Sequence, residues 1–403
     1  MPLDLTRLSR QVREMSSALN REAPEYAQRR TQALERYLRE SSAHATWAQA
    51  VDLSRDGCVW LLARPVEPLN TVRDAPPRPP DYAVIATDGS HIDIDRHGAA
   101  LCYVLNIGRV YLRYGANPTA HLSSHPTLCF REEDLYLTDG MRRIPIEGNY
   151  LSARRDVAEG VELVALANEF LAANDMPALA LQDGTLVRWT LAGAERAVLD
   201  HFLRPYLNYL DEMRQRKIPV ASYISRPRSP EVAGMIRLML CPDVNLEQQR
   251  GAKCSACSDA AAGRTPSCFV CQGLSDADIL ADMLDEGQRG PLFASMSRVN
   301  VESYGAHLIH FFYIRVGREI ARVEMPRWVA EDAELLDRVH ALVYDQCLKG
   351  QGYPVALARA HEQAVIRAAD RRAFERIVEQ SLIHANLPAT SSRKAASKEQ
   401  QAV

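Results

Sequence analysis

The chain has 403 residues, of which 47% are hydrophobic and 25% are charged, as in an ordinary globular protein large enough for one elaborated domain or two. Its formal net charge of −3 excludes a protein coated in basic surface, but not a local nucleic-acid channel, because local charge density decides that question. Apolar runs stay shorter than the roughly 18 residues of a membrane span, and the N-terminus lacks the apolar core of a signal peptide. We therefore expect a cytoplasmic protein.

The N-terminal part of the chain is predicted to form a helical arm. Residues 1 to about 65 show helical spacing with many charges, and the proline-rich run 74–80 indicates a stiff linker. We assign residues 1–75 to this arm and its linker.

Strands and helices alternate beyond the linker. The strands are expected at 82–87, 99–106, 109–114, 178–182 and 218–224, with a hairpin at 306–316 and 319–324, and the helices at 151–173, 191–216, 331–349 and 354–383. This order favours an α/β fold, a ribonuclease-H-like mixed sheet flanked by helices. We assign it to one domain over 80–385, followed by a polar tail over 386–403 that is expected to be disordered.

One short motif occurs twice. The strands predicted at 82–87 and 178–182 each run into an aspartate, a glycine and a hydroxyl residue, beginning at Asp88 and Asp183. A carboxylate at the end of a buried strand is held on rigid backbone, and the glycine lets the chain turn away. Two such carboxylates repel each other unless a cation lies between them, and oxygen-rich sites suit Mg²⁺ or Mn²⁺. The pair indicates metal-dependent phosphate chemistry.

Four of the nine cysteines form a tight array, Cys254-x-x-Cys257 and, ten residues later, Cys268-x-x-Cys271. Such paired knuckles indicate a tetrahedral zinc site, which would be structural because four protein ligands leave no position for water. Cys241 could replace one ligand. The alternative is a set of free thiols in a variable loop. We interpret residues 241–275 as a Cys-rich insertion.

Five motifs, in order between about residue 80 and 385, resemble those of the NurA nucleases. The sequences at Asp88 and Asp183 resemble the first and second aspartate motifs of that family. Between them, residues 154–159 resemble its helix with a conserved glutamate. Residues 222–229 look like the strand-end motif that usually carries a basic residue, and residues 352–361 resemble the C-terminal histidine motif.

This resemblance implies a metal-dependent DNA nuclease, using Mn²⁺ or Mg²⁺, with a ribonuclease-H-like core. It further implies action on single- or double-stranded DNA ends in end resection and repair, homodimers, and a HerA-type hexameric ATPase as partner. By the resemblance, Asp88, Glu159, Asp183 and His361 would hold the metal, with His361 alternatively moving a proton.

Two positions depart from a simple match. Glu162 lies one turn beyond Glu159 and could be the third carboxylate instead. The basic position is Arg226, where archaeal members tend to have lysine; an arginine there would stabilise phosphate charge but would not donate a proton.

Two other functions stay open from the residues alone. One is a non-catalytic, zinc-stabilised scaffold that binds an ATPase or DNA. The other is a haloacid-dehalogenase-like phosphatase, which also opens with an aspartate after an apolar strand. That chemistry needs a second aspartate two residues on, and Ser90 occupies that position.

Overall fold

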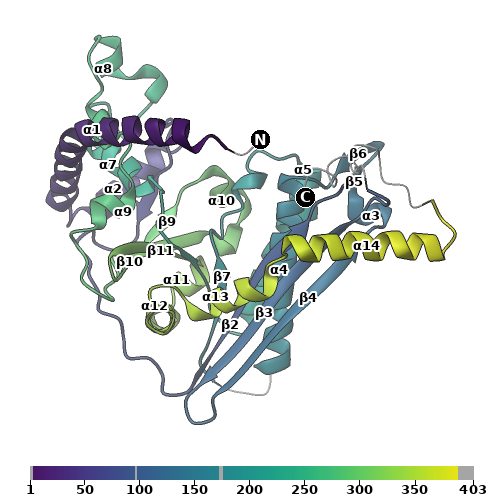
Figure 1. Ribbon diagram of the computed structural model, residues 1–403. Coiled ribbons are helices and arrows are strands. Elements are labelled where there is room, and N and C mark those ends of the chain that lie inside the picture. The colour runs from purple at the N-terminus through teal and green to yellow at the C-terminus, as the bar shows by residue number, and fades with distance from the viewer. Residues whose placement is uncertain (1–2, 96–97, 172–175, 389–403) are drawn as a thin grey trace. The chain divides into compact units, whose positions relative to one another are not determined.

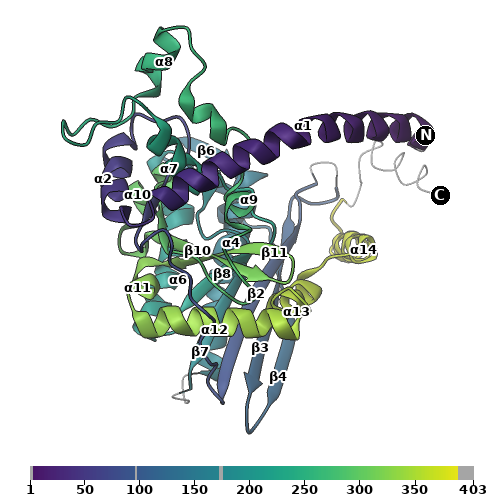
Figure 2. The same cartoon turned by 90° about the vertical axis from the view of Figure 1, so that its left-hand side faces the viewer.

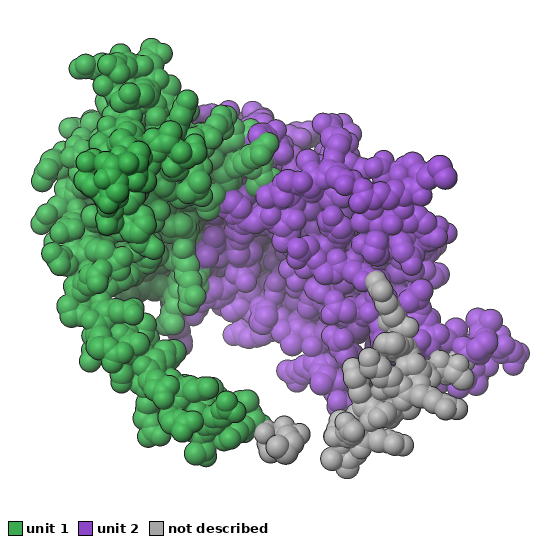
Figure 3. All heavy atoms as spheres, turned by 90° about the horizontal axis from the view of Figure 1, so that it is seen from above, with its two compact units in different colours: residues 1–74, 225–301, 310–323 green, residues 75–224, 302–309, 324–403 purple. Residues whose placement is uncertain are grey.

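The computed structural model describes residues 3–95, 98–171 and 176–388. The chain divides into two compact units (Figure 3). Unit 1 comprises residues 1–74, 225–301 and 310–323, and unit 2 comprises residues 75–224, 302–309 and 324–403. None of the helices in the described ranges is long and apolar enough to cross a membrane. The predicted tail falls outside the described residues from position 389 onward.

Unit 1 combines helices with four strands in the order β1-β9-β10-β11. Its core includes Tyr37, Met235 and Phe311, all fully buried. The elements that lie wholly or mainly in this unit are α1 (Leu5–Arg39), α2 (His44–Ser54), β1 (Ala63–Pro65), α7 (Glu231–Leu240), η3 (Cys254–Ala256), α8 (Ser258–Ala261), η4 (Ser267–Cys271), α9 (Asp276–Leu280), β9 (Phe293–Ser295), α10 (Arg298–Ser303), β10 (Ile309–Val316) and β11 (Glu319–Pro326).

Unit 2 contains strands in the order β8-β7-β2-β3-β4, and β2, β3 and β4 run side by side as long strands (Figures 1 and 2). Its elements are β2 (Tyr82–Ile92), β3 (Tyr103–Tyr114), β4 (Thr119–Cys129), α3 (Glu132–Leu135), β5 (Tyr136–Asp139), β6 (Arg142–Pro145), α4 (Asn149–Phe170), β7 (Ala178–Asp183), η1 (Trp189–Leu191), α5 (Arg196–Val198), η2 (Leu199–Leu203), α6 (Arg204–Gln215), β8 (Val220–Ile224), η5 (Gly305–His307), α11 (Arg327–Ala330), α12 (Ala333–Lys349), α13 (Val355–Ala364) and α14 (Ala368–His384).

The sheet of unit 2 is mixed. Strand β7 runs parallel to both β2 and β8, whereas β3 is antiparallel to β2 and β4. Helices α4 and α13 both pack on β2 and β3. The predicted mixed α/β sheet flanked by helices is confirmed.

Opposite faces of β2 carry these two helices. A side chain at Gly89 would project into Glu159 of α4, and one at Gly108, which pairs with Asp88, would project into Ala360 of α13. Neighbouring residues of a strand point to opposite faces. Because Asp88 and Gly89 are neighbours, α4 and α13 cover different faces of the sheet.

Several predicted boundaries were wrong. The strands expected at 99–106 and 109–114 form one strand, β3, because Gly108 serves close packing rather than a turn: a Cβ there would lie 2.1 Å from the carbonyl oxygen of Ala360. Strand β4 was missed because its polar residues are almost all exposed and it contains Pro126, as edge strands tolerate.

The two long helices expected at 191–216 and 354–383 differ from the observed ones. The first begins only at Arg196, after the short η1, and continues to Gln215 through the π-helical turn η2, with a proline in the first turn of α6. The second ends at Ala364 and restarts as α14, where the backbone N–H of Arg367 donates to Asp370 Oδ2 at 2.8 Å. Residues 172–173 of the helix expected at 151–173 lie outside the described ranges.

Candidate active site

Two aspartates lie where the parallel pairing of β2 and β7 ends in unit 2. The paired register of β2 and β7 runs to Thr87 opposite Gln182, so Asp88 and Asp183 are the next residues on the two strands. Residues that follow equivalent positions of adjacent parallel strands project from the same edge. The twin motif found in the sequence therefore forms one local site.

The two strands behave differently after their aspartates. Strand β7 ends at Asp183, and Gly184 turns the chain with a φ of 73°. Strand β2 instead continues to Ile92, so the turn expected after Asp88 is wrong. Each aspartate accepts a hydrogen bond from the following backbone N–H, from Gly89 at 2.8 Å and from Gly184 at 2.9 Å. These bonds fix both carboxylates against their own backbone.

Helix α13 brings His361 to this edge. Its Nδ1 lies 2.8 Å from Asp88 Oδ2, and the imidazole is 70% exposed. Asn106 Nδ2 donates to the carbonyl oxygen of Ala364 at 2.8 Å, which ties the end of α13 to β3. The structure therefore brings together Asp88, Asp183 and His361, with His361 open to solvent.

Tyr353 joins the site and was missed as a functional residue. Its hydroxyl donates to Asp183 Oδ1 at 2.8 Å, and its ring meets Tyr223 edge to face at a centroid distance of 5.5 Å. Burial, and then the charge of Asp183, raise the pKa of Tyr353, so the hydroxyl stays a donor. Its place in the C-terminal motif, eight residues before His361, was the available signal.

We expect Tyr353→Phe to lower metal-activated turnover about tenfold, because a hydrogen bond to a charged group contributes about 1.5–3 kcal/mol. The measurement is the rate against Mn²⁺ concentration, which separates weaker metal binding from slower chemistry. Tyr136→Phe, in the β5–β6 hairpin, is the matched control and should behave like the wild type. Equal rates for both variants would remove Tyr353 from the site.

Glu159 reaches the same strand from the other face. The hydroxyl of Thr87 donates to the carbonyl oxygen of Glu159 at 3.0 Å, which fixes this turn of α4 against β2. A Cβ on Gly89 would lie only 2.5 Å from Glu159 Oε1, so glycine is required for the carboxyl group to sit there. Strand β7 pairs with β2 only as far as Thr87. Beyond that residue, no paired position of β7 among the described residues lies between Asp88 on one face of β2 and Glu159 on the other.

Glu159 is the most perturbed acid of the site. It is 7% exposed, and burial, followed by the negative charges of Asp156 and Asp88, raises its pKa to about 8 despite the opposing charge of Arg155. Arg155 Nε lies 3.3 Å from Glu159 Oε1. Asp156 is held by Arg188, at 2.7 Å from Nη1 to Oδ2. A buried acid beside two other carboxyl groups is the electrostatic condition that a cation relieves.

Arg155, Asp156 and Arg188 were not singled out from the sequence. Asp156 and Arg155 stand three and four residues before Glu159, so helical spacing placed them beside it. Arg188 gave no local signal, because a turn after β7 brings it back to α4. Its guanidinium is buried over the ring of Tyr206, 4.6 Å from the centroid.

Glu162, the alternative third carboxylate, has other partners. Its Oε2 lies 3.2 Å from Arg109 Nε, and its Oε1 lies 2.7 Å from His125 Nδ1. These are residues of β3 and β4, so Glu162 is engaged in ion pairs while Glu159 is the glutamate next to Gly89.

Arg226 belongs to unit 1, and its role stays a prediction. Its side chain is 89% exposed, and its Nε lies 3.8 Å from Glu319 Oε2. Its backbone N–H donates to Glu319 Oε1 at 2.6 Å, and its φ is 45°. Glu319 therefore fixes the backbone at this position and leaves the guanidinium in solvent.

The predicted zinc ligands also belong to unit 1. Cys254, Cys257 and Cys268 are partly buried, whereas Cys271 is 1% exposed within the apolar core. Among all described residues, no three histidine, cysteine or carboxylate side chains stand close enough together to hold a metal ion as they are placed. At Asp88, the acids and His361 are instead engaged with the groups named above.

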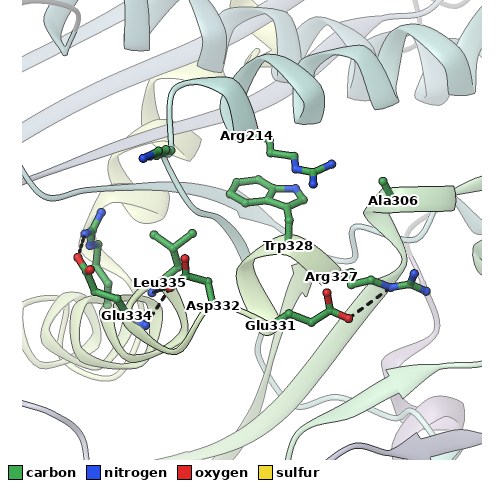
Figure 4. Close-up of a pocket in the computed structure, with 10 residues that line it drawn as sticks. Arg214, Ala306, Arg327, Trp328, Glu331, Asp332, Glu334 and Leu335 are labelled. Carbon is green, nitrogen blue, oxygen red and sulfur yellow. Dashed lines mark hydrogen bonds and ion pairs between the residues drawn. The ribbon is translucent and has the colours of Figure 1, made fainter.

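A separate cavity of about 660 Å³ lies in unit 2 at the end of α6 (Figure 4). Figure 4 shows the indole of Trp328 beside Arg214. Two of the lining carboxylates pair with lining arginines, so Arg214 and Lys217 add positive charge next to an aromatic ring. The lining residues are Arg214, Lys217, Ala306, Arg327, Trp328, Glu331, Asp332, Glu334, Leu335 and Arg338.

The region at the carboxyl ends of parallel strands is the usual place for a functional site in an α/β sheet, and here the parallel pairing of β2 and β7 ends at two aspartates. The NurA domain model matches residues 82–366, well over half of the chain. The chain therefore belongs to the NurA family and is a nuclease-type protein. The matched segment contains Asp88, Glu159, Asp183, Arg226 and His361.

Two solved structures are similar to this chain. A crystal structure of NurA with manganese is 11% identical, covers 76% of this chain and 90% of its own, and has a TM-score of 0.35. A crystal structure of NurA is 12% identical, covers 77% of this chain and 91% of its own, and has a TM-score of 0.36. No curated protein matches the sequence.

Proposed function

We propose that this protein is a divalent-metal-dependent deoxyribonuclease that acts on DNA ends. The observation that carries the proposal is the parallel register of β2 and β7, which makes Asp88 and Asp183 the next residues after the last paired positions of the two strands. Membership of the NurA family supports phosphodiester hydrolysis as the reaction.

The donor set fits a hard divalent cation such as Mn²⁺ or Mg²⁺. Asp88 and Asp183 offer carboxylate oxygens, His361 offers an imidazole nitrogen, and Glu159 is a buried acid that a nearby cation would allow to ionise. These four residues would hold the metal. Bound there, a divalent ion supplies an activated water and neutralises charge on the phosphate.

The chain's own groups have defined tasks in this proposal. Tyr353 and the backbone N–H groups of Gly89 and Gly184 orient the two aspartates. His361, exposed and next to Asp88, is placed to move a proton at the departing oxygen if it is not a ligand. Arg226 would contribute charge to the phosphate.

Partner proposals rest on surfaces of each unit. In α1, a stripe of apolar side chains with alternating spacings of three and four residues is 39–66% exposed, which supports docking on another protein, here a HerA-type hexameric ATPase. This stripe consists of Leu5, Leu8, Val12, Met15 and Leu19. The edge strand β4 exposes Leu122 and Leu128, which supports a homodimer.

The cavity at Trp328 supports contact with DNA. Arg214 and Lys217 suit phosphate groups, and the partly buried ring of Trp328, which lines the cavity, suits an unpaired base. The family resemblance, together with these features, supports a role for the protein in DNA end resection and repair.

The test is degradation of end-labelled linear DNA in Mn²⁺, Mg²⁺ or EDTA, with Asp183→Asn alongside. We expect label loss in the metals, none in EDTA, and a loss of at least about 10²-fold in the variant. Folded protein without turnover in any metal, with or without an ATPase partner, would support the scaffold function instead.

A further inference from the structure

Cys58 lies against the Cys-rich insertion, although nearly 200 residues separate them in sequence. It follows α2, and the backbone N–H of Cys254 donates to the carbonyl oxygen of Gly57 at 2.9 Å. A Cβ on Gly57 would lie 2.2 Å from the carbonyl oxygen of Ala252, so only glycine allows this approach. Cys58, the residue after Gly57, therefore lies next to Cys254.

A second contact joins Cys241 to the same insertion. The backbone N–H of Ser258 donates to Asp243 Oδ2 at 2.9 Å, which links the loop after α7 to the residue after Cys257. The backbone N–H of Val244 donates to the carbonyl oxygen of Cys241 at 3.4 Å, which holds the start of this loop in a turn. Cys241 therefore begins a loop that is tied to the insertion at Ser258.

Five thiols therefore share one place in unit 1. Cys58 interacts with Cys241 and Cys268 as well as with Cys254, and Cys268 interacts with Cys241 and Cys257. Burial, followed by the charge of Cys254, raises the pKa of Cys58 to about 12. The five thiols come from three separate segments: the turn after α2, the residue after α7 and the insertion.

Cys271 differs from these five. It belongs to the apolar core cluster and is 1% exposed, and it lies beside Cys268 at the end of η4. A core position explains this cysteine without a metal.

We propose that unit 1 holds a structural Zn²⁺ bound by four thiolates from the cluster Cys58, Cys241, Cys254, Cys257 and Cys268, with Cys58 a ligand and Cys271 not. Within the described ranges the sulfurs are not yet at coordinating distances, so binding draws them together by side-chain rotation. Each thiol that binds releases its proton to solvent. Four thiolates match the tetrahedral preference of Zn²⁺.

The insertion explains why a metal would be useful. Between Cys241 and Cys271 the regular structure consists of short pieces only, the longest being the five residues of η4. Helical pieces as short as these bury little apolar surface. A metal that also binds Cys58 would anchor it to α2, because metal binding energy becomes folding energy when the ligands come from separate segments.

The test is the zinc content of purified full-length protein, together with Co²⁺ replacement, whose sulfur-to-metal absorption reports thiolate ligands. We expect about one Zn²⁺ per chain for the wild type and for Cys271→Ala. Cys58→Ser should lose most of the metal and most of the Co²⁺ absorption. Cys102→Ser, in unit 2, serves as a control outside the cluster.

Either of two results would overturn the proposal. One is a wild-type chain that neither contains zinc nor binds added Zn²⁺ or Co²⁺. The other is full metal content in Cys58→Ser with loss in Cys271→Ala, which would restore the paired-knuckle set Cys254, Cys257, Cys268 and Cys271. If Cys58→Ser misfolds, alkylation of the wild type with and without Zn²⁺ gives the same decision, because peptide mass spectrometry shows whether Cys58 is among the thiols that the metal protects.

Discussion

Replacing Asp88 with asparagine is expected to lower Mn²⁺-dependent DNA hydrolysis by about 10³-fold, which corresponds to about 4 kcal/mol of transition-state stabilisation. The variant keeps the size of the side chain and its contact with the N–H of Gly89, but it removes the charge that a metal shares with Asp183. It also weakens the contact with His361, now 2.8 Å from Asp88 Oδ2. Initial rates on end-labelled DNA across a Mn²⁺ titration measure the loss.

Glu362→Gln is the matched control for this experiment. Glu362 follows His361 on α13, is exposed, and pairs with Arg359 at 2.7 Å, so removing its charge leaves the site intact. Thermal unfolding should be nearly the same for both variants and the wild type. A folded Asp88→Asn protein with rates like those of Glu362→Gln would show that Asp88 is not at the catalytic metal.

The strands predicted best from the sequence were those buried on both faces of the sheet, because their sequences are mostly apolar. Strands β7 and β8 are continuous apolar runs, and the buried sheet explains why their predicted bounds were close to the observed ones. Strand β4 gave no such pattern, because all of its residues except Cys129 are exposed. A gap that contains Gly108 was expected between the strands at 99–106 and 109–114, since sequence does not show that α13, much later in the chain, approaches the strand there.

The candidate site follows the same rule. Asp88 and Asp183 were predictable because each follows an apolar run of strand length, and the two runs pair in parallel up to the residues before the aspartates. The environment of Glu159 was not, since its neighbour Arg188 comes from a turn that only the tertiary fold brings to α4. Cys58 was passed over for a similar reason: no spacing links it to the cysteine array, and its contact with Cys254 depends on Gly57.

Glu159 couples the stability of the metal-free protein to pH. Its pKa is raised from 4.5 to about 8 by burial and by nearby acids, so the folded chain binds one proton more than the unfolded chain between these values. Stability falls with rising pH wherever the folded state holds more protons. The contribution of this carboxyl group to folding is therefore favourable at low pH and is lost as pH rises through about 8.

Glu159→Gln should therefore make the metal-free protein more stable at alkaline pH while lowering its nuclease activity about 10²-fold. Glutamine imitates the neutral acid, so urea unfolding in EDTA should match the wild type near about pH 5 and exceed it by about 1–4 kcal/mol near about pH 8.5. Added Mn²⁺ should make the wild type the more stable protein, because only the wild type has a carboxylate at position 159 to bind the cation.

Glu162→Gln supplies the comparison on the same helix. Its carboxylate is paired with Arg109 and His125, so removing the charge should cost stability at alkaline pH instead of adding it. If Glu159→Gln also loses stability at alkaline pH, the acid is already ionised and paired with Arg155 in the metal-free fold. If only Glu159→Gln gains stability at alkaline pH, this carboxyl group is neutral in the metal-free protein and ionises when a cation binds. Part of the free energy of metal binding then offsets the cost of burying the ionised group.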